Sequence, residues 1–462
     1  MKKWVATMVA YGCVFLRSVA QEWAPLEAGL VTPPLQLFND ADTSLIVLGN
    51  YQATTNGLFV DGMARWNGES FGTLTGAPAG EAWSNTASNM VRYQDDLYFH
   101  CGGSIGQMYV EGFPVTRGLC KYDGVEITNP ITQAYNGAYN PLTIYRGQIA
   151  LGSSRMEQGQ AMVYFWDGND LDSISATGFQ ATHLGAFFAS DMLEYDGKLI
   201  FGGNLHFAKG GVHEIVSWCP EEGFDDMNHG VRGFGPHVQA LEVYNGELIV
   251  CGYFFSAGGN PTDFIMRWDG ENFLPMGIIG ANNRVDALMT YGGYLYAGGL
   301  FTQMDAIDCR IARWNGESWE AFNTSNSATP GGFSGNIRDF EIFQGELHIC
   351  GGFDVIDEVE VNGVAKYTGP LALTNFTIFS NGFDDAADIE LTPNQLVLSN
   401  LATEHSWLLE MANSEKELVY SEWRMSVEEP WVIATSGFEP GEYYVSLASA
   451  EGHYTTKIQL LP

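Results

Sequence analysis

The fold of this 462-residue chain is decided by the stretch Ala240-Leu241-Glu242-Val243-Tyr244-Asn245-Gly246-Glu247-Leu248-Ile249-Val250-Cys251-Gly252. Two apolar runs flank Asn245-Gly246, a dipeptide that accepts the positive φ angles of a type I′ hairpin turn. After a loop, a similar pattern continues in Ile265-Met266-Arg267-Trp268-Asp269-Gly270-Glu271-Asn272-Phe273. The two segments predict two consecutive β-hairpins, and therefore a unit of four antiparallel strands.

Copies of this unit fill most of the chain. A glycine near the end of the second strand recurs at intervals of 46 to 53 residues, and an aromatic residue of the third strand follows each glycine by 14 to 20 residues. The glycines are Gly49, Gly102, Gly152, Gly202, Gly252, Gly298 and Gly351, and the aromatic residues are Trp66, Tyr122, Trp166, Trp218, Trp268, Trp314 and Tyr367. Seven units of four short strands predict an all-β fold built on a seven-bladed β-propeller.

Turn dipeptides separate the strands of each unit. The first hairpin carries pairs such as Asp196-Gly197 and Asn245-Gly246. The third strand ends at a similar pair, and we expect the same two-residue turn there. These second pairs are Asn67-Gly68, Asp123-Gly124, Asp167-Gly168, Asp269-Gly270 and Asn315-Gly316.

The two ends of the repeat array complement each other. The seventh unit stops after Tyr367-Thr368-Gly369 without a fourth strand, whereas Trp23-Ala24-Pro25-Leu26-Glu27-Ala28-Gly29 resembles the fourth-strand segment Phe273-Leu274-Pro275-Met276-Gly277. We therefore expect the N-terminal strand to complete the last blade. Such a clasp would pair strands that are otherwise exposed edges.

The repeated pattern resembles the Kelch-like propeller repeats of secreted Bacteroidetes proteins. The resemblance lies in the apolar strand, the glycine turn, the strand ending in Gly-Gly, and segments such as Arg313-Trp314-Asn315-Gly316-Glu317-Ser318-Trp319. It covers about residues 22–375 and implies the fold. It implies little about function, because propellers support many unrelated activities.

The C-terminal part departs from the repeat. Residues 376–388 are rich in Asn, Gly and Asp and are predicted to be a linker, and residues 389–462 form a separate strand-rich unit, predicted to be a small immunoglobulin-like β-sandwich. This unit resembles the sorting domain of the type IX secretion system, and the matching residues include Pro393, Asn394, Gly441 and Tyr443. Gln395 and Glu415 depart from the family pattern. The resemblance implies the type IX secretion machinery as a partner, and a generic binding domain is the alternative.

Residues 1–20 have the pattern of a secretory signal peptide. Lys2 and Lys3 precede a short apolar run, and Ser18-Val19-Ala20 offers small residues for cleavage. The propeller would then occupy residues 21–375 of a secreted or surface protein of a Gram-negative bacterium. A lipoprotein signal at Cys13 is an alternative.

The charge of the chain excludes some partners. Lys and Arg number 21 against 55 Asp and Glu, for a net charge of −34, so a nucleic-acid partner is not expected. No segment after the signal is predicted to cross a membrane. No cofactor is expected beyond loosely bound calcium, for which the acidic pairs are Asp95-Asp96, Asp225-Asp226 and Asp384-Asp385.

Residues that recur in every blade are interpreted as structural, because each blade must pack on its neighbours. Five basic residues that precede the repeat aromatic are therefore expected in ion pairs or on aromatic faces: Arg65, Lys121, Arg267, Arg313 and Lys366. By similar reasoning Cys101, Cys251 and Cys350 are interpreted as buried thiols. The fourth unit breaks the symmetry with His206, His213, His229 and His237, which are weak ligand-site candidates. Their spacing fits no compact metal motif, and we interpret them as loop residues in solvent.

No catalytic residue is assigned, because the chain lacks the hydrolase, metalloprotease and phosphate-loop motifs. The architecture favours a binding or adhesion-like protein with a glycan or protein ligand. The aromatic-rich loop Phe254-Phe255-Ser256-Ala257-Gly258-Gly259-Asn260 is one surface for such a ligand. A polysaccharide hydrolase with a dispersed acid pair and a purely structural surface component are the alternatives.

Overall fold

The computed structural model describes the chain in segments. They are residues 23–41, 43–50, 53–60, 62–76, 86–102, 107–111, 113–116, 118–131, 141–152, 161–175, 188–205, 214–232, 237–262, 264–322, 335–356, 359–368, 388–392, 395–399, 407–413, 418–424, 431–434, 441–449 and 452–460. Residues 1–20, predicted to be a signal peptide, and most of the predicted linker 376–388 lie outside them. The described residues contain strands and turns with no helix, and so offer no helix that could cross a membrane.

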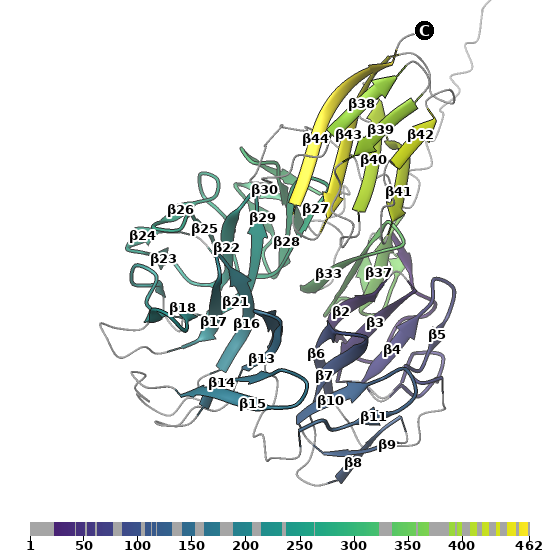
Figure 1. The fold of residues 1–462 in the computed structure, drawn as a ribbon, viewed down its shortest axis with the longest axis vertical. Coiled ribbons are helices and arrows are strands. Elements are labelled where there is room, and N and C mark those ends of the chain that lie inside the picture. Colours follow the sequence, from purple (N-terminus) through teal and green to yellow (C-terminus); the bar gives the residue numbers. More distant parts are fainter. Residues whose placement is uncertain are drawn as a thin grey trace, which may run out of the picture.

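Seven four-stranded antiparallel sheets form the seven predicted blades (Figure 1). Blade 1 contains β2 (Pro34–Asp40), β3 (Ser44–Gly49), β4 (Met63–Trp66) and β5 (Phe71–Gly72). Blade 2 contains β6 (Thr86–Tyr93), β7 (Asp96–Gly102), β10 (Gly118–Tyr122) and β11 (Ile127–Thr128). Blade 3 contains β12 (Leu142–Tyr145), β13 (Gln148–Gly152), β14 (Ala161–Trp166) and β15 (Leu171–Ser175).

The remaining blades repeat this order. Blade 4 contains β16 (Phe188–Tyr195), β17 (Lys198–Asn204), β18 (Ile215–Cys219) and β19 (Gly223–Asp225). Blade 5 contains β21 (His237–Tyr244), β22 (Glu247–Tyr253), β25 (Ile265–Trp268) and β26 (Phe273–Pro275). Blade 6 contains β27 (Val285–Tyr291), β28 (Tyr294–Gly299), β31 (Ile311–Trp314) and β32 (Trp319–Ala321). Blade 7 contains β33 (Ile337–Phe343), β34 (Glu346–Gly351), β37 (Val364–Tyr367) and β1 (Trp23–Pro25).

Short hairpins extend several loops between the second and third strands. They are β8 (Gln107–Val110) with β9 (Phe113–Thr116), β23 (Ser256–Ala257) with β24 (Asn260–Pro261), β29 (Gln303–Met304) with β30 (Ile307–Asp308), and β35 (Val355–Ile356) with β36 (Val359–Glu360). The short strand β20 (Val231–Arg232) pairs with β23 and joins blades 4 and 5.

The predicted clasp is confirmed. Strand β1 pairs with β37 in the register Trp23↔Tyr367, Ala24↔Lys366 and Pro25↔Ala365. The Trp23 side chain is buried and contacts the Tyr367 ring edge-on, at 5.2 Å between ring centroids. The N-terminal strand thus occupies the fourth position of blade 7.

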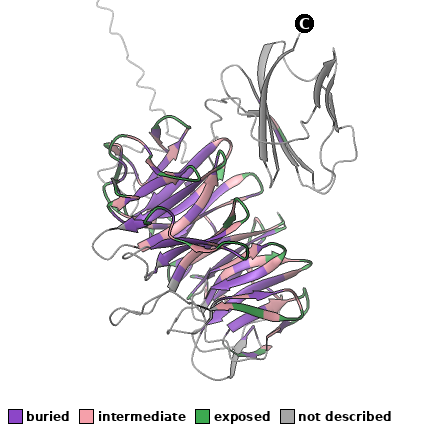
Figure 2. Cartoon of the chain, turned by 60° about the vertical axis from the view of Figure 1, so that its left-hand side comes forward, coloured by how far each residue is buried: buried purple, intermediate pink, exposed green. Residues whose placement is uncertain are grey.

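The ring of blades is closed. The innermost strands β2, β6, β12, β16, β21, β27 and β33 contact one another in sequence, and β33 also contacts β2. At this last junction the Asp339 carboxylate accepts a 2.8 Å hydrogen bond from the Leu37 N–H, and Asn39 donates to the Ile342 carbonyl. Hydrophobic clusters fill the spaces between neighbouring blades, and one of them joins Val47 and Trp66 to Phe343 across the same junction. Figure 2 shows the buried residues concentrated along the strands of the blades.

The two hairpins of a blade use different turns. Asp196-Gly197 and Asn245-Gly246 have positive φ at both residues, as predicted for two-residue turns. The prediction of the same turn in the second hairpin is wrong. There the loop has four residues, because Trp66 pairs with Phe71, and the Asn67 side chain accepts hydrogen bonds from the N–H groups of Glu69 and Ser70. The equivalent residues Asp123, Asp167, Asp269 and Asn315 accept the corresponding pair of bonds.

The cysteines divide into two groups. Cys251 and Cys350 are buried free thiols, as predicted, and Cys219 and Cys309 are also buried and free. The interpretation of Cys101 is wrong, because a disulfide joins it to Cys120 on the adjacent strand β10. The third strand explains the difference: the residue two positions before the repeat aromatic is Cys120 in blade 2, but Met266 in blade 5 and Ala365 in blade 7. The register also differs, because Cys101 lies four residues after the partner of the repeat aromatic, and Cys251 and Cys350 lie three residues after theirs.

The C-terminal residues form two antiparallel sheets. One contains β38 (Asp388–Thr392), β39 (Gln395–Ser399) and β42 (Trp431–Ala434), and the other contains β40 (Trp407–Asn413), β41 (Leu418–Arg424), β43 (Gly441–Ser449) and β44 (Gly452–Leu460). Leu409 and Met411 of β40 are fully buried. The immunoglobulin-like packing of the two sheets stays a prediction, because most of their side chains lie outside the described residues.

Candidate functional site

The four histidine candidates do not form one site. His206 and His213 lie outside the described residues. His229 is exposed, as predicted, and its Nδ1 lies 3.2 Å from the Asp226 carboxylate. The interpretation of His237 as a loop residue in solvent is wrong: it is half-buried and begins the innermost strand of blade 5.

The five recurring basic residues have the predicted structural role. Each contacts the first residue of the second strand in its own blade. Lys121, Arg267 and Lys366 form ion pairs with Asp96, Glu247 and Glu346, Arg65 donates to the Ser44 hydroxyl, and Arg313 lies over the Tyr294 ring. These contacts explain why basic residues recur at this position, and no ligand is needed to explain it.

The sorting-domain candidates are described only in part. Pro393 and Asn394 lie outside the described residues. Gly441 and Tyr443 lie in β43, where Gly441 pairs with Leu460, and Tyr443 pairs with Ile458 on one side and Asn413 on the other. Their role in export stays a prediction.

A group of polar side chains that the repeat pattern did not predict lies where the innermost strands begin. Six of these strands contain a register irregularity near the start, and the unpaired residues there include Ser190, Asp286 and Arg338. A β-bulge re-aims the side chain of the extra residue. Here it provides polar side chains in strands that are otherwise largely apolar.

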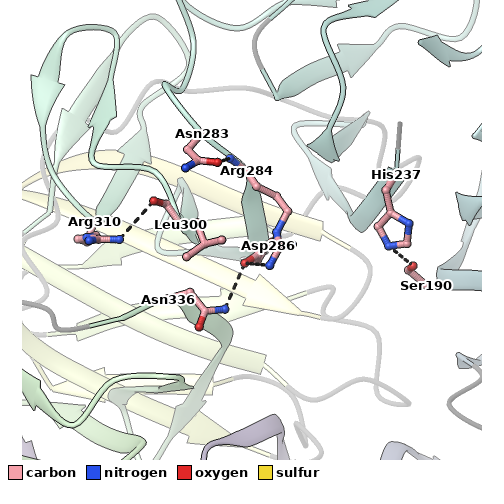
Figure 3. Close-up of polar contacts among 8 residues, drawn as sticks. All are labelled: Ser190, His237, Asn283, Arg284, Asp286, Leu300, Arg310 and Asn336. Atoms are coloured by element: carbon pink, nitrogen blue, oxygen red, sulfur yellow. Dashed lines mark hydrogen bonds and ion pairs between the residues drawn. The ribbon is translucent and has the colours of Figure 1, made fainter. Parts of the chain in front are cut away.

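We call this group the inner-strand polar belt. It consists of Ser190, His237, Arg284, Asp286, Asn336 and Arg338, which come from blades 4, 5, 6 and 7. Figure 3 shows Asp286 between Arg284 and Asn336, with the His237–Ser190 pair to one side and Arg310 beside Leu300 on the other.

Hydrogen bonds link the belt from one blade to the next. The Ser190 hydroxyl lies 2.8 Å from Nε2 of His237. Arg284 holds the Asp286 carboxylate with two donors, and Asn336 Nδ2 donates to the same carboxylate at 3.3 Å. Arg338 Nη1 donates to the Pro34 carbonyl of blade 1 at 3.0 Å. The belt therefore continues across the clasped junction.

The charges of the belt are unevenly balanced. Burial raises the pKa of Asp286, and its hydrogen bond and charge contacts with Arg284, together with Asn336 and Arg338, oppose that rise. Burial and the positive charge of Arg284 lower the pKa of His237, so its imidazole is neutral at pH 7. Arg284 is paired with Asp286, whereas the hydrogen bonds of the Arg338 side chain to described residues go to carbonyl oxygens.

Exposed apolar side chains border the belt at blades 5 and 6. Tyr253 pairs with His237 and is 36% exposed, and Phe255 is 37% exposed. Both rings pack against Phe264, with ring centroids 5.4 to 5.7 Å apart. Phe254, also expected at this surface, is fully buried instead. The side chain of Leu300, whose N–H donates to the Arg284 carbonyl, is 37% exposed.

Carboxyl groups farther along the innermost strands bind main chain rather than ligand. Asp191 accepts a 2.7 Å hydrogen bond from the Leu241 N–H of the next blade, just as Asp339 accepts from Leu37. Burial raises the pKa of Asp191 to about 6 and that of Asp339 to about 7, against the opposing effect of these bonds. These residues join blades and explain part of the polarity inside the ring.

Glu214 is a buried carboxyl group with an incomplete set of partners among the described residues. It is 1% exposed, and one of its oxygens accepts a 2.7 Å hydrogen bond from the Leu205 N–H while the other has no hydrogen-bond partner in that part of the chain. Burial raises its pKa to about 8, so the group is mainly protonated at pH 7.

The acidic pairs considered for calcium have other partners where they are described. Asp96 pairs with Lys121, Asp226 contacts His229, and Asp225 accepts from the Met227 N–H. Asp384 and Asp385 lie outside the described residues. Within the described segments no three acidic, histidine or cysteine side chains come together as a metal site would require.

Comparisons with known proteins leave the chain without a family. No protein-family model and no curated protein matches it. Among solved structures, the extracellular domain of a candidate one-component system from B. thetaiotaomicron aligns with 92% of this chain and 80% of its own, at 10% identity and a TM-score of 0.23. YjhT aligns with 73% of this chain and 94% of its own, at 11% identity and a TM-score of 0.31. At these scores the identification of the propeller rests on its own strand pairing.

Proposed function

We propose that this protein is an exported β-propeller that binds a saccharide ligand, as an adhesion-like interaction protein at the cell surface or in the medium. The binding site is the inner-strand polar belt with the adjoining side chains of Tyr253, Phe255 and Leu300. One observation supports this most strongly. At blades 5 and 6, exposed apolar side chains and hydrogen-bonding side chains adjoin one another where the innermost strands begin.

The chemistry of these side chains suits a sugar ring. An aromatic face covers the apolar C–H face of a pyranose, while amide, hydroxyl and guanidinium groups bond its hydroxyls. Tyr253 and Phe255 supply the faces, and Asn336, Ser190 and Arg284 supply polar groups. Recognition sites are usually built on loops and strand ends held by a rigid scaffold, and this site fits that description.

A glycan array tests the proposal. The chain from residue 21 should bind a subset of saccharides, and Tyr253→Ala with Phe255→Ser should lose that binding at least tenfold while the melting temperature stays within a few degrees. Phe59→Ser is the matched control, because Phe59 is 43% exposed and lies in blade 1. Retention of binding by the double variant would place the ligand elsewhere, and a chain that binds no saccharide would favour a protein ligand or a structural role.

Export completes the proposal. The signal-peptide pattern and the resemblance of residues 389–462 to a type IX sorting domain support passage across both membranes. The Cys101–Cys120 disulfide also supports export, since disulfides persist in oxidising compartments. Ending the chain after Asp388 should trap the propeller in the periplasm of a host with the type IX machinery, as measured by fractionation. Normal secretion of that truncated chain would contradict a sorting role.

Polysaccharide hydrolysis is a second candidate, favoured only by Glu214. A buried carboxyl that stays protonated at neutral pH has the property of a general acid. A screen for reducing ends released from polysaccharides decides the question. If the wild-type chain releases reducing ends and Glu214→Gln does not, the protein is an enzyme. If the wild-type chain releases none, the binding proposal remains.

A further inference from the structure

Two arginines near the belt have no carboxylate partner among the described residues, although the chain has a large excess of acidic residues. Of the arginines whose side chains the structure describes, Arg92, Arg146, Arg267, Arg284 and Arg313 form ion pairs. Arg65 has the structural contact with Ser44 described above. The two that remain are Arg310 and Arg338, in adjacent blades 6 and 7.

The environment of Arg310 is unusual for a structural residue. Its Nη1 donates to the Leu300 carbonyl at 3.2 Å, while its Nε is buried and has no hydrogen-bond partner in the described part of the chain. In the equivalent position blade 5 has Phe264 and blade 7 has Gly363, so the fold does not require a guanidinium there. Leu300 connects Arg310 to the belt, because the Leu300 N–H donates to the Arg284 carbonyl at 2.9 Å.

Arg338 directs a second positive charge to the same region. Within the described residues its side chain donates to the carbonyls of Pro33 and Pro34, which carry no net charge, and its positive charge also acts on Asp286 of the belt. The only acidic member of the belt, Asp286, is already bound by Arg284 and Asn336. A surplus of positive charge therefore remains, and it adjoins exposed apolar side chains.

We propose that Arg310 and Arg338 bind the oxyanion of an acidic saccharide, a carboxylate or a sulfate on a sugar ring that packs against Tyr253 and Leu300. This deepens the proposed function and rests on it. The guanidinium fork matches both oxyanions and forms charge-assisted hydrogen bonds that are stronger than neutral ones.

Paired saccharides that differ only in charge test the inference. The probes are an oligogalacturonate and its fully methyl-esterified form, and a sulfated galactan oligosaccharide and its desulfated form, titrated calorimetrically into the chain from residue 21. We expect at least one charged probe to bind ten or more times as tightly as its neutral counterpart, with an affinity that falls as salt is added. The charged probe that binds better identifies the carboxylate or the sulfate.

Variants locate the anion site. Arg310→Gln and Arg338→Gln should each reduce affinity for the charged probe about tenfold or more and leave affinity for its neutral form unchanged. Arg267→Gln is the matched control, because that side chain is paired with Glu247 within blade 5. Equal binding of charged and neutral probes, or charged binding that both variants retain, would overturn the inference and leave the proposed function standing. Failure of all four probes to bind would count against both.

Discussion

Replacing Trp23 by alanine should destabilise the whole propeller, although the residue lies on an edge strand of its blade. The side chain is 1% exposed and packs against Tyr367, and among the described strands its own strand pairs with β37 alone. Truncating a fully buried tryptophan costs about 3–5 kcal/mol of unfolding free energy, which includes the aromatic contact. We therefore expect the Trp23→Ala variant to lose that amount, because Trp23 fills the space between blades 6 and 7 and its strand joins the N-terminal segment to blade 7.

Urea unfolding followed by far-UV circular dichroism measures this loss. Trp319→Ala is the matched control, because Trp319 occupies the same place in blade 6, is 3% exposed and pairs with Trp314. The two variants should be destabilised to a similar extent. A loss below about 1 kcal/mol for Trp23→Ala, beside the full loss for Trp319→Ala, would refute the reasoning that the clasp is an integral part of the propeller.

Two further outcomes follow from buried groups. Burial raises the folded-state pKa of Asp339 to about 7, above the roughly 3.9 of an unfolded chain. Between about pH 4 and pH 7 the folded state therefore holds a proton that the unfolded state has released, and stability falls as the pH rises. Asp339→Asn removes the titrating group and keeps one acceptor oxygen for Leu37, at the loss of the one that accepts from Phe340. Relative to wild type, the variant's stability should therefore rise by roughly 1–3 kcal/mol from pH 5 to pH 8 in urea titrations; a parallel pH dependence would contradict this. In a thiol titration, the chain from residue 21 should show four free thiols after denaturation without reductant and almost none when folded, because Cys219, Cys251, Cys309 and Cys350 are buried. Six thiols after denaturation would contradict the Cys101–Cys120 disulfide.

The architecture could be predicted from the sequence because it is repetitive. Four strands per blade, seven blades and the N-terminal clasp all follow from apolar runs and turn dipeptides that recur many times. The ion pairs of Lys121, Arg267 and Lys366 were predictable for the same reason. A pattern that recurs in several blades can still be recognised when one copy is irregular.

Features that occur once were harder to predict. The disulfide of Cys101 depends on a strand register that is offset by one residue from the blades carrying Cys251 and Cys350. The belt depends on bulges, which move Asp286 and Arg338 out of the alternating pattern. A usable signal was present: charged residues at the second position of β27 and β33 interrupt strands that otherwise bury apolar side chains. Which groups then meet across blades is decided only in three dimensions.

The shared seventh blade also sets an order of events in time. A chain that emerges from a ribosome or a secretion channel N-terminus first presents Trp23 long before its partner Tyr367 exists outside. Before β33 emerges, the innermost strand β2 lacks a neighbour on one side. Before residues 364–367 emerge, the sheet that contains β33 is incomplete. The ring therefore closes as one late step, and a protease or a mutation that removes either end reopens a structure in which every blade depends on its two neighbours.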